Sequence, residues 1–150
     1  MTPTDMHAPV EQCHAHPAPV RTFDRVFPAV PAQVREARRF LAGLLDGCAV
    51  ADEAITCLSE LAANACLHSA SALPGGTFTV RVRIGCGGQL RVEVADEGGP
   101  WVTGLREDEW PHGLAIVASL AADSGVCGDA VTGWTSWVAF SCPCQNAMPD

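Results

Sequence analysis

The strongest constraint on the fold is a run of alternating residues in the middle of the chain. Polar and apolar residues alternate over residues 77–84, and the alternation resumes over residues 90–94 after the glycine-rich residues 85–88. A period of two is typical of a half-buried strand, and a glycine-rich turn between two such runs predicts an antiparallel hairpin. The apolar face of this hairpin needs a covering layer, which the rest of the chain must supply.

Helical periodicity precedes the hairpin and can supply that layer. Apolar residues at helical spacing predict a helix over residues 34–46, with Gly47 as its stop. A second helix is predicted near residues 50–70. In front of both, residues 21–27 alternate as a half-buried strand does, and Pro28 ends that strand.

A long segment without periodicity follows the hairpin, over residues 98–111, and holds two tryptophans and an acidic run. Unpatterned chain of this length inside a compact domain is more often a functional lid than a simple connector. Residues 113–121 then predict a helix, which Gly125 breaks off. Residues 126–127 and 132–140 predict two closing strands.

Together these elements predict an α/β fold. We expect a two-layer sandwich with a mixed, mostly antiparallel sheet and helices on one face. The 150 residues suit one domain with enough length to bury a core. The domain is expected to span residues 21–141, between a flexible N-terminal tail, residues 1–20, and a short C-terminal tail, residues 142–150.

The balance of charge excludes several classes of function. A formal net charge of −8 disfavours nonspecific attraction to nucleic acid or to an anionic membrane. All nine cationic residues are arginines, which excludes a P-loop and any mechanism with a Schiff-base lysine. No export pattern and no apolar run of the roughly 20 residues that span a bilayer is recognisable, so we expect a cytoplasmic protein.

The chain contains eight cysteines, but thiols in a cytoplasmic protein normally stay reduced. Cys48, Cys57 and Cys66 fall within the helical patterns and are interpreted as small hydrophobic residues. Two terminal clusters stand apart, Cys-His-Ala-His at 13–16 and Cys-Pro-Cys at 142–144. Neither has the two spaced ligand pairs of a structural zinc site, so a thiol or metal sensor is only an alternative.

Three polar side chains line one stripe of the second predicted helix. Glu60, Asn64 and His68 follow at intervals of four, and residues four apart share one side of an α-helix. Leu58 and Leu61 fall at core spacing on a different side. A carboxylate, a carboxamide and an imidazole beside an apolar seam could face a cleft. A solvated polar face is the alternative.

Asp96 continues the apolar set of the second hairpin strand. Leu90, Val92 and Val94 precede it at steps of two, so Asp96 should point to the covered face of the sheet. A buried carboxylate without a partner is costly, so a hydrogen-bond donor is expected there. The alternative is that the strand ends and Asp96 caps a turn toward Gly98.

Four motifs follow one another along the chain: Glu60-Leu-x-x-Asn64 with His68, Asp96-x-Gly98, Gly113-Leu114-x-Ile-Val, and Gly133-x-Thr135. In this order, with a lid between the second and third, they resemble the Bergerat-fold ATPases. That superfamily includes gyrase B subunits, heat-shock ninety chaperones, mismatch-repair ATPases and sensor histidine kinases. The likeness is strongest to the small serine/threonine kinases that act as bacterial anti-sigma factors, and it covers roughly residues 21–141.

The resemblance implies a phosphate end of a nucleotide site. Asn64 would ligate the Mg²⁺ that bridges the triphosphate, and Glu60 would be the general base that takes a proton from the attacking hydroxyl. Gly113 and Leu114 would begin the helix whose amides receive phosphate. His68 would lie near phosphate or serve in packing.

The resemblance also implies an adenine end. Asp96 would accept a hydrogen bond from the adenine amino group, which is the donor that its position requires. Gly98 would let the backbone approach the base, and Thr135 would support the same end through its hydroxyl.

The implied function is an ATP- and Mg²⁺-dependent protein serine/threonine kinase. It would phosphorylate an anti-sigma-factor antagonist of the STAS type and sequester a sigma factor, without direct contact to nucleic acid or membrane. Relatives commonly dimerise through the sheet side, so a homodimer is one expectation. The alternative is a non-catalytic regulator of the same fold that binds a partner in a nucleotide-dependent way.

Pro111 is a departure from the pattern of the relatives. They usually carry Gly-x-Gly before the third helix, where this chain has Pro-His-Gly at 111–113. Proline has no amide hydrogen and a fixed φ, so one phosphate donor is lost and the lid hinge stiffens. Because proline is also favoured at the first position of a helix, a benign substitution is the alternative.

Overall fold

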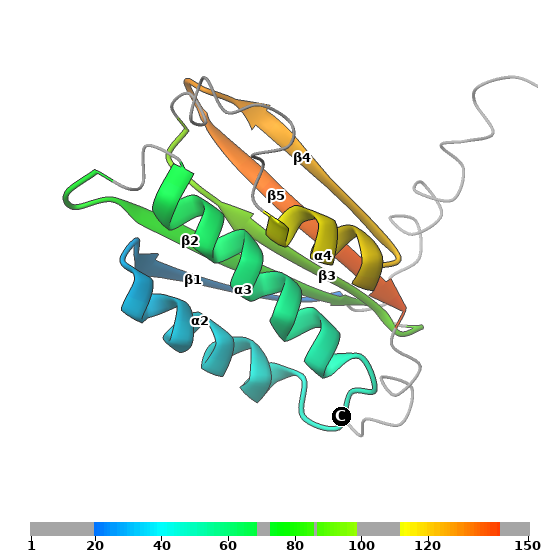
Figure 1. Ribbon diagram of the computed structural model, residues 1–150. Helices are drawn as coiled ribbons and strands as arrows, with labels where there is room; N and C mark the ends of the chain where they lie inside the picture. Colours follow the sequence, from blue (N-terminus) through cyan, green and yellow to red (C-terminus); the bar gives the residue numbers. More distant parts are fainter. Residues whose placement is uncertain (1–19, 69–72, 86, 99–111, 142–150) are drawn as a thin grey trace, which may run out of the picture.

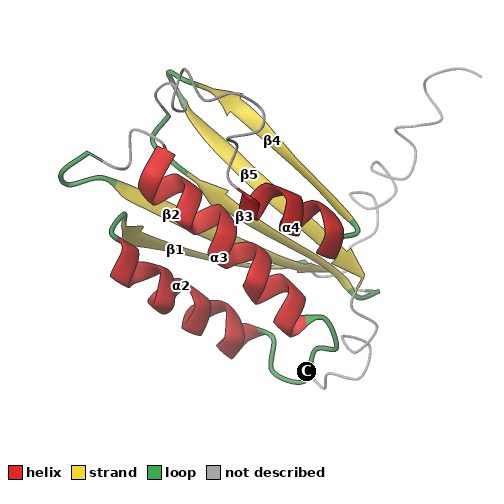
Figure 2. Ribbon diagram, in the orientation of Figure 1, coloured by secondary structure: helices red, strands yellow, loops and turns green. Residues whose placement is uncertain are grey.

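The computed structural model describes residues 20–68, 73–85, 87–98 and 112–141. In this part of the chain three helices cover one face of a five-stranded sheet, as Figure 1 and Figure 2 show. The predicted two-layer α/β architecture is therefore confirmed. The strands are β1 (Arg21–Pro28), β2 (Thr77–Gly85), β3 (Gln89–Ala95), β4 (Asp123–Asp129) and β5 (Gly133–Ser141), and the helices are α2 (Pro31–Leu44), α3 (Ala51–His68) and α4 (His112–Leu120).

The strand order is β1-β2-β3-β5-β4, and each neighbouring pair is antiparallel. The predicted hairpin is confirmed as β2 and β3, in which Val82 lies opposite Val92. Its turn uses Gly87 and Gly88 at φ values of 96° and 85°, in the left-handed region that favours glycine. β1 and β4 are the edges of this sheet.

The core lies between the sheet and the helix layer, in which α3 is the middle helix (Figure 1). α3 buries mostly alanine, cysteine and leucine side chains, and the small ones let it lie close to the sheet. Phe27 and Phe78 stack with 5.4 Å between ring centroids. Burying each large apolar side chain contributes about 1.5–3 kcal/mol. The hairpin supplies Phe78, Val80, Val82, Ile84, Leu90, Val92 and Val94 to this core.

Two boundaries differ from the sequence prediction. α2 begins at Pro31 and not at residue 34, because the missing N–H of a proline is not needed in the first helical turn. The prediction that Gly125 breaks off the third helix is wrong. That helix, α4, ends at Leu120, and Gly125 lies within β4 opposite Trp137. A Cβ on Gly125 would lie 2.8 Å from the indole ring, so this position accommodates the tryptophan.

Cys48 also differs from the prediction. It lies in the connection between α2 and α3, because Gly47 at φ 79° turns the chain out of the helix. Cys48 is disulfide-bonded, so its interpretation as a reduced thiol within a helix is wrong. Cys57 and Cys66, in contrast, are free and buried in α3 as predicted, and Cys127 is free and exposed. The partner of Cys48 is therefore none of these three cysteines.

Some predicted features lie outside the described residues. These are the N-terminal tail up to residue 19, the lid residues 99–111 with Pro111, and the C-terminal tail from residue 142. The domain limits therefore stay a prediction. No described helix has the length and apolar character needed to cross a membrane. The described residues also contain no cluster of three or more His, Cys, Asp or Glu side chains that could hold a metal ion.

Candidate functional site

Asn64 is a buried polar side chain on α3, with 3% of its surface exposed. Among the described residues, its Nδ2 is the one buried side-chain nitrogen or oxygen atom without a hydrogen-bond partner. An unpaired buried amide costs about 1–3 kcal/mol, so a partner from outside the protein chain is expected. Asn64 is therefore the centre of the candidate site.

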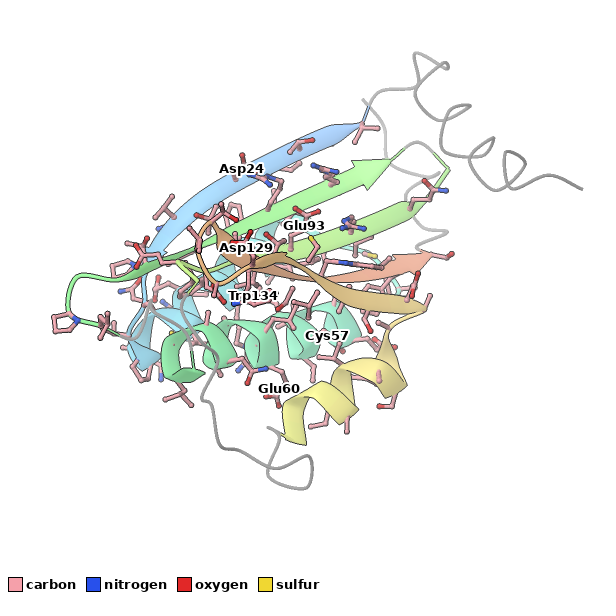
Figure 3. The ribbon with its side chains drawn as sticks, turned by 90° about the horizontal axis from the view of Figure 1, so that it is seen from above. Asp24, Cys57, Glu60, Glu93, Asp129 and Trp134 are labelled. Atoms are coloured by element: carbon pink, nitrogen blue, oxygen red, sulfur yellow. The ribbon has the colours of Figure 1, made fainter. Side chains whose placement is uncertain are left out.

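Glu60 precedes Asn64 by one turn of α3 and is half-buried. Figure 3 shows Glu60 on the side of α3 that faces away from the sheet. The structure thus contains two members of the predicted polar stripe: the buried amide of Asn64 and the more accessible carboxylate of Glu60. His68, the third predicted member, is the last residue of α3, and its side chain is not among the described ones.

Cys57 is a buried thiol on α3, near the carboxylates of Glu60 and Glu53. Its burial, and after that the negative charges of Glu60 and Glu53, raise the pKa of its thiol to about 11. The thiol therefore stays protonated near neutral pH and is a poor nucleophile. Cys57 serves the packing of α3 and is not a reactive group of the site.

Asp96 follows the last residue of β3, and two backbone amides hold its carboxylate. Oδ1 accepts hydrogen bonds from the N–H of Gly98 at 2.7 Å and from the N–H of Trp134 at 3.1 Å. The N–H of Asp96 donates to the carbonyl oxygen of Trp134 at 2.9 Å, which extends the β3–β5 ladder by one residue. Because ionised acceptors make strong hydrogen bonds, these contacts fix the direction of the half-buried side chain. The turn-capping bond to Gly98 is thus present.

Gly98 and Gly133 meet in a tightly packed corner beside Asp96. Gly98 has a φ of +85°, and a Cβ there would lie 2.5 Å from the carbonyl oxygen of Ala130. Gly133 has a φ of +115°, and its Cβ would lie 2.6 Å from the carbonyl oxygen of Asp96. Both positions therefore require glycine for packing as well as for backbone conformation. The second and fourth sequence motifs meet at this corner.

Two adjacent hydroxyl residues of β5, Thr135 and Ser136, point to opposite faces of the sheet. Ser136 pairs with Val94 and is 5% exposed, on the face that the helices cover. Thr135 pairs with Ala95, and the alternation of the strand turns it to the uncovered face. The structure therefore does not bring the Thr135 hydroxyl to the face of α3. Sequence analysis missed Ser136. Residues two apart in a strand share a face, so counting back from the apolar Val138 would have placed Ser136 on the covered face.

α4 begins at His112, so Gly113 lies in its first turn as predicted. This turn contains no acidic residue, so no side chain of its own neutralises the positive end of the helix dipole. α4 packs beside α3, on the side opposite to α2 (Figure 1). The helix expected to receive phosphate thus lies next to the helix that carries Asn64. The side chain of Leu114 is outside the described set.

The donor groups on α3 fit a magnesium ion. Mg²⁺ prefers oxygen ligands, keeps several waters, and usually takes only one or two protein groups together with phosphates. The Asn64 amide and the Glu60 carboxylate are oxygen donors one helical turn apart. A half-turn of the amide exchanges its oxygen with its nitrogen, because the two have nearly the same shape. Asn64 can therefore present an oxygen to a cation from its buried position.

Residues 27–128 match the family model described as histidine kinase-like ATPase domain. The chain belongs to this family. The matched residues include the α3 stripe, Asp96 with Gly98 and the whole of α4, and the match ends within β4. The resemblance drawn from the sequence motifs is thereby confirmed at the level of the family and of its fold.

Two solved structures are similar to this member of the family. The RsbU and RsbW domains of Rv1364c from Mycobacterium tuberculosis align with a TM-score of 0.64 and 21% identity, over 81% of this chain and 32% of that chain. The histidine kinase domain from Erythrobacter litoralis EL346 blue-light activated histidine kinase aligns with a TM-score of 0.50 and 24% identity, over 81% of this chain and 64% of that chain. The chain thus spans less than two thirds of either structure. No curated protein matches it significantly.

Proposed function

We propose that this histidine kinase-like ATPase domain binds ATP with Mg²⁺ and transfers the γ-phosphoryl group to a serine or threonine of a partner protein. The observation that carries the proposal is the buried, unpartnered amide of Asn64, one helical turn from Glu60. A purely structural core position favours an apolar residue, because an unpaired amide lowers stability. Membership of an ATPase family supports a nucleotide as the missing partner.

At the phosphate end, Asn64 would hold the metal ion and Glu60 would act on a proton. When bound, Mg²⁺ supplies the positive charge that phosphoryl transfer needs. Glu60 would take the proton of the attacking hydroxyl as that oxygen approaches the γ-phosphorus. The first turn of α4 would offer backbone amides to the phosphate oxygens.

At the adenine end, Asp96 would accept a hydrogen bond from the adenine amino group. The amides of Gly98 and Trp134 fix its carboxylate before a ligand arrives, which reduces the entropy lost on binding. Ser136 lies on the covered face of β5, two residues after Trp134, whose N–H donates a hydrogen bond to Asp96. We therefore assign to Ser136 the hydroxyl role that the motif comparison gave to Thr135.

We further propose that the phosphorylated partner is an anti-sigma-factor antagonist of the STAS type and that the chain also binds a sigma factor in the cytoplasm. The order of the four sequence motifs supports this regulatory role. The RsbW domain in the name of one structurally similar protein is consistent with it. A homodimer through the sheet side remains part of the same proposal.

Nucleotide binding is tested by isothermal titration of the full chain with Mg-ATP and Mg-ADP. Asp96→Ala should abolish binding, because it removes the acceptor for the adenine amino group. Asp46→Ala is a matched control, since Asp46 is an exposed carboxylate in the α2–α3 connection. Wild type that is folded but binds neither nucleotide would refute the proposal.

Phosphoryl transfer is tested with purified STAS-type antagonists and radiolabelled Mg-ATP. Glu60→Gln should lower transfer by about 10²-fold or more while nucleotide binding is retained, because only the general base is lost. Glu53→Gln is a matched control on the same helix, two turns earlier and likewise half-buried. Equal transfer by wild type and Glu60→Gln would remove the assignment of the base.

A non-catalytic regulator is the second candidate function, and Pro111 favours it because proline lacks the amide that relatives offer to phosphate. In that case the wild type binds nucleotide and a partner but transfers no phosphate. Pro111→Gly then tests the cause directly. Gain of transfer in this variant would show that the lost amide limits catalysis.

A further inference from the structure

A basic hollow lies between the edge strand β1 and the first turns of α2. Its volume is about 790 Å³, and Arg25, Arg35 and Arg38 are the cationic residues that line it. Arg25 extends from β1, whereas Arg35 and Arg38 lie three residues apart on α2 and so share one side of the helix. Three of the nine cationic residues of a chain with net charge −8 therefore converge on one place.

The positive charge of this hollow is not neutralised by the described part of the protein. All three arginines are exposed, and none forms an ion pair with a described residue. Glu36 is the one acidic residue among those that line the hollow, and it pairs with Arg39 outside it at 3.1 Å. The guanidinium groups are thus available to an acidic ligand.

Aromatic side chains hold one of these groups in place. The guanidinium carbon of Arg25 lies 4.9 Å from the ring centroid of Phe27 and 6.0 Å from that of Phe40. Stacking on two rings restricts the side chain, so less conformational entropy is lost when a carboxylate binds it. An ordered, unpaired arginine at a sheet edge is a suitable anchor for a partner.

A second hollow with three arginines, on the uncovered face of the sheet, is less suited to an acidic ligand. Its volume is about 730 Å³. Arg81 there already pairs with Asp24 at 3.1 Å and with Glu93 at 3.3 Å. Arg91 pairs with Glu93 at 2.6 Å, so only Arg83 has no ion pair with a described residue.

We propose that the hollow of Arg25, Arg35 and Arg38 is a docking surface for an acidic segment of a partner protein. A short acidic segment fits because its carboxylates meet the three arginines while the rest of the partner need not touch the acidic remainder of this molecule. A nucleic acid or an anionic membrane extends beyond the hollow and meets that negative charge. The convergence of three exposed arginines without ion pairs to described residues at one hollow also favours one orientation of the partner.

The docking surface and the nucleotide site lie on different sides of the molecule. α2 flanks α3 on one side and α4 flanks it on the other (Figure 1). A segment docked at α2 therefore leaves the α3–α4 side open. The inference does not depend on the proposed kinase activity, since it rests on the charges of α2 and β1 alone.

The test uses a fluorescein-labelled oligoglutamate peptide and the full chain, with fluorescence anisotropy at low salt. Arg35→Glu and Arg38→Glu should each weaken binding by about fivefold or more, because each change replaces an attraction with a repulsion. Arg83→Glu is the matched control: it makes the same change of charge at an exposed, unpaired arginine on the uncovered face, and it should alter affinity by less than about twofold. Since all three positions are exposed, thermal unfolding should be unchanged. Backbone amide shifts on adding the peptide should fall in β1 and α2.

Three results would overturn the proposal. One is an equal loss of affinity in Arg83→Glu, which would mean attraction to net charge alone. Another is the absence of peptide binding even at low salt, where screening is weakest. The third is binding of tripolyphosphate or of phosphatidylglycerol vesicles under conditions where the peptide does not bind, which would identify a different class of ligand.

Discussion

At the scale of single residues, the amide of Asn64 should lower the stability of the protein while it serves the proposed binding of Mg-ATP. Asn64→Leu replaces the unpartnered amide with an apolar side chain of similar size, so the free energy of unfolding should stay equal or rise by about 1 kcal/mol. Binding of Mg-ATP should be lost in the same variant. Urea unfolding and isothermal titration on one preparation measure both effects. A loss of stability above about 1 kcal/mol would mean that the wild-type amide is satisfied within the protein.

Ser136 and Thr135 offer a second comparison between neighbouring residues. Ser136→Ala should weaken ATP binding by about tenfold, the value of one hydrogen bond, because its hydroxyl lies on the covered face. Thr135→Val removes a hydroxyl from the uncovered face and should leave ATP affinity unchanged. Titration of both variants with Mg-ATP decides between them. The reverse order of effects would restore the assignment made from the motif.

The site was predictable from sequence where spacing alone fixes direction. Four-residue steps placed Glu60 and Asn64 on one stripe of α3, and two-residue steps brought Asp96 to the end of the covered row. The motif Gly133-x-Thr135 does not by itself indicate which hydroxyl lies on the covered face, because a shift of one residue in a strand exchanges its two faces. The pairing of β5 with β3, which settles this register, is a contact between distant parts of the sequence and is not readable from β5 itself.

At the scale of elements, the packed corner of Gly98 and Gly133 joins the end of β3 to the turn between β4 and β5. Gly98→Ala should lower the free energy of unfolding by about 1–3 kcal/mol, since it adds a Cβ 2.5 Å from the Ala130 carbonyl oxygen at a positive φ. It should also weaken ATP binding, because the amide that orients Asp96 moves.

Gly43 provides the control for that substitution. It lies in α2, and a Cβ there would meet no atom within 4 Å. Gly43→Ala should therefore stabilise the protein by about 0.5–1 kcal/mol through the higher helix propensity of alanine. Urea unfolding of the two variants compares them directly. Equal effects of the two changes would show that the corner is not tightly packed.

Elements with a regular pattern were predictable over most of their length, whereas β4 was predicted only in part. β2, β3, α2 and α3 follow from periodicity within each segment. β4 reads Asp-Ser-Gly-Val-Cys-Gly-Asp, with two glycines and no apolar alternation, so only residues 126–127 of this seven-residue strand were predicted from the sequence. It forms because β5 offers an edge for pairing and because Gly125 makes room for Trp137.

At the scale of the whole molecule, the basic hollow and the proposed nucleotide site involve different helices on either side of α3. The proposed nucleotide site lies at α3 and the first turn of α4, whereas the basic hollow lies at α2 and β1. Because the chain carries a net charge of −8, it repels an acidic partner as a whole, and the unpaired arginines of the hollow offer a local attraction. A substrate protein could thus be held on one side of α3 while nucleotide occupies the other.

At the same scale, the disulfide of Cys48 ties down the α2–α3 connection, and a disulfide restricts the unfolded chain. Cutting it should lower the free energy of unfolding, by about 2–4 kcal/mol for a typical native disulfide. Cys48→Ser, or treatment with dithiothreitol, should therefore lower the melting temperature measured by circular dichroism. Cys127→Ser is the control. Because Cys127 is exposed and free, this substitution should change the melting temperature little. Peptide mapping without reductant should find Cys48 joined to a cysteine other than Cys57, Cys66 or Cys127. Titration of all eight thiols in the unreduced, denatured protein would show instead that this bond is absent in solution.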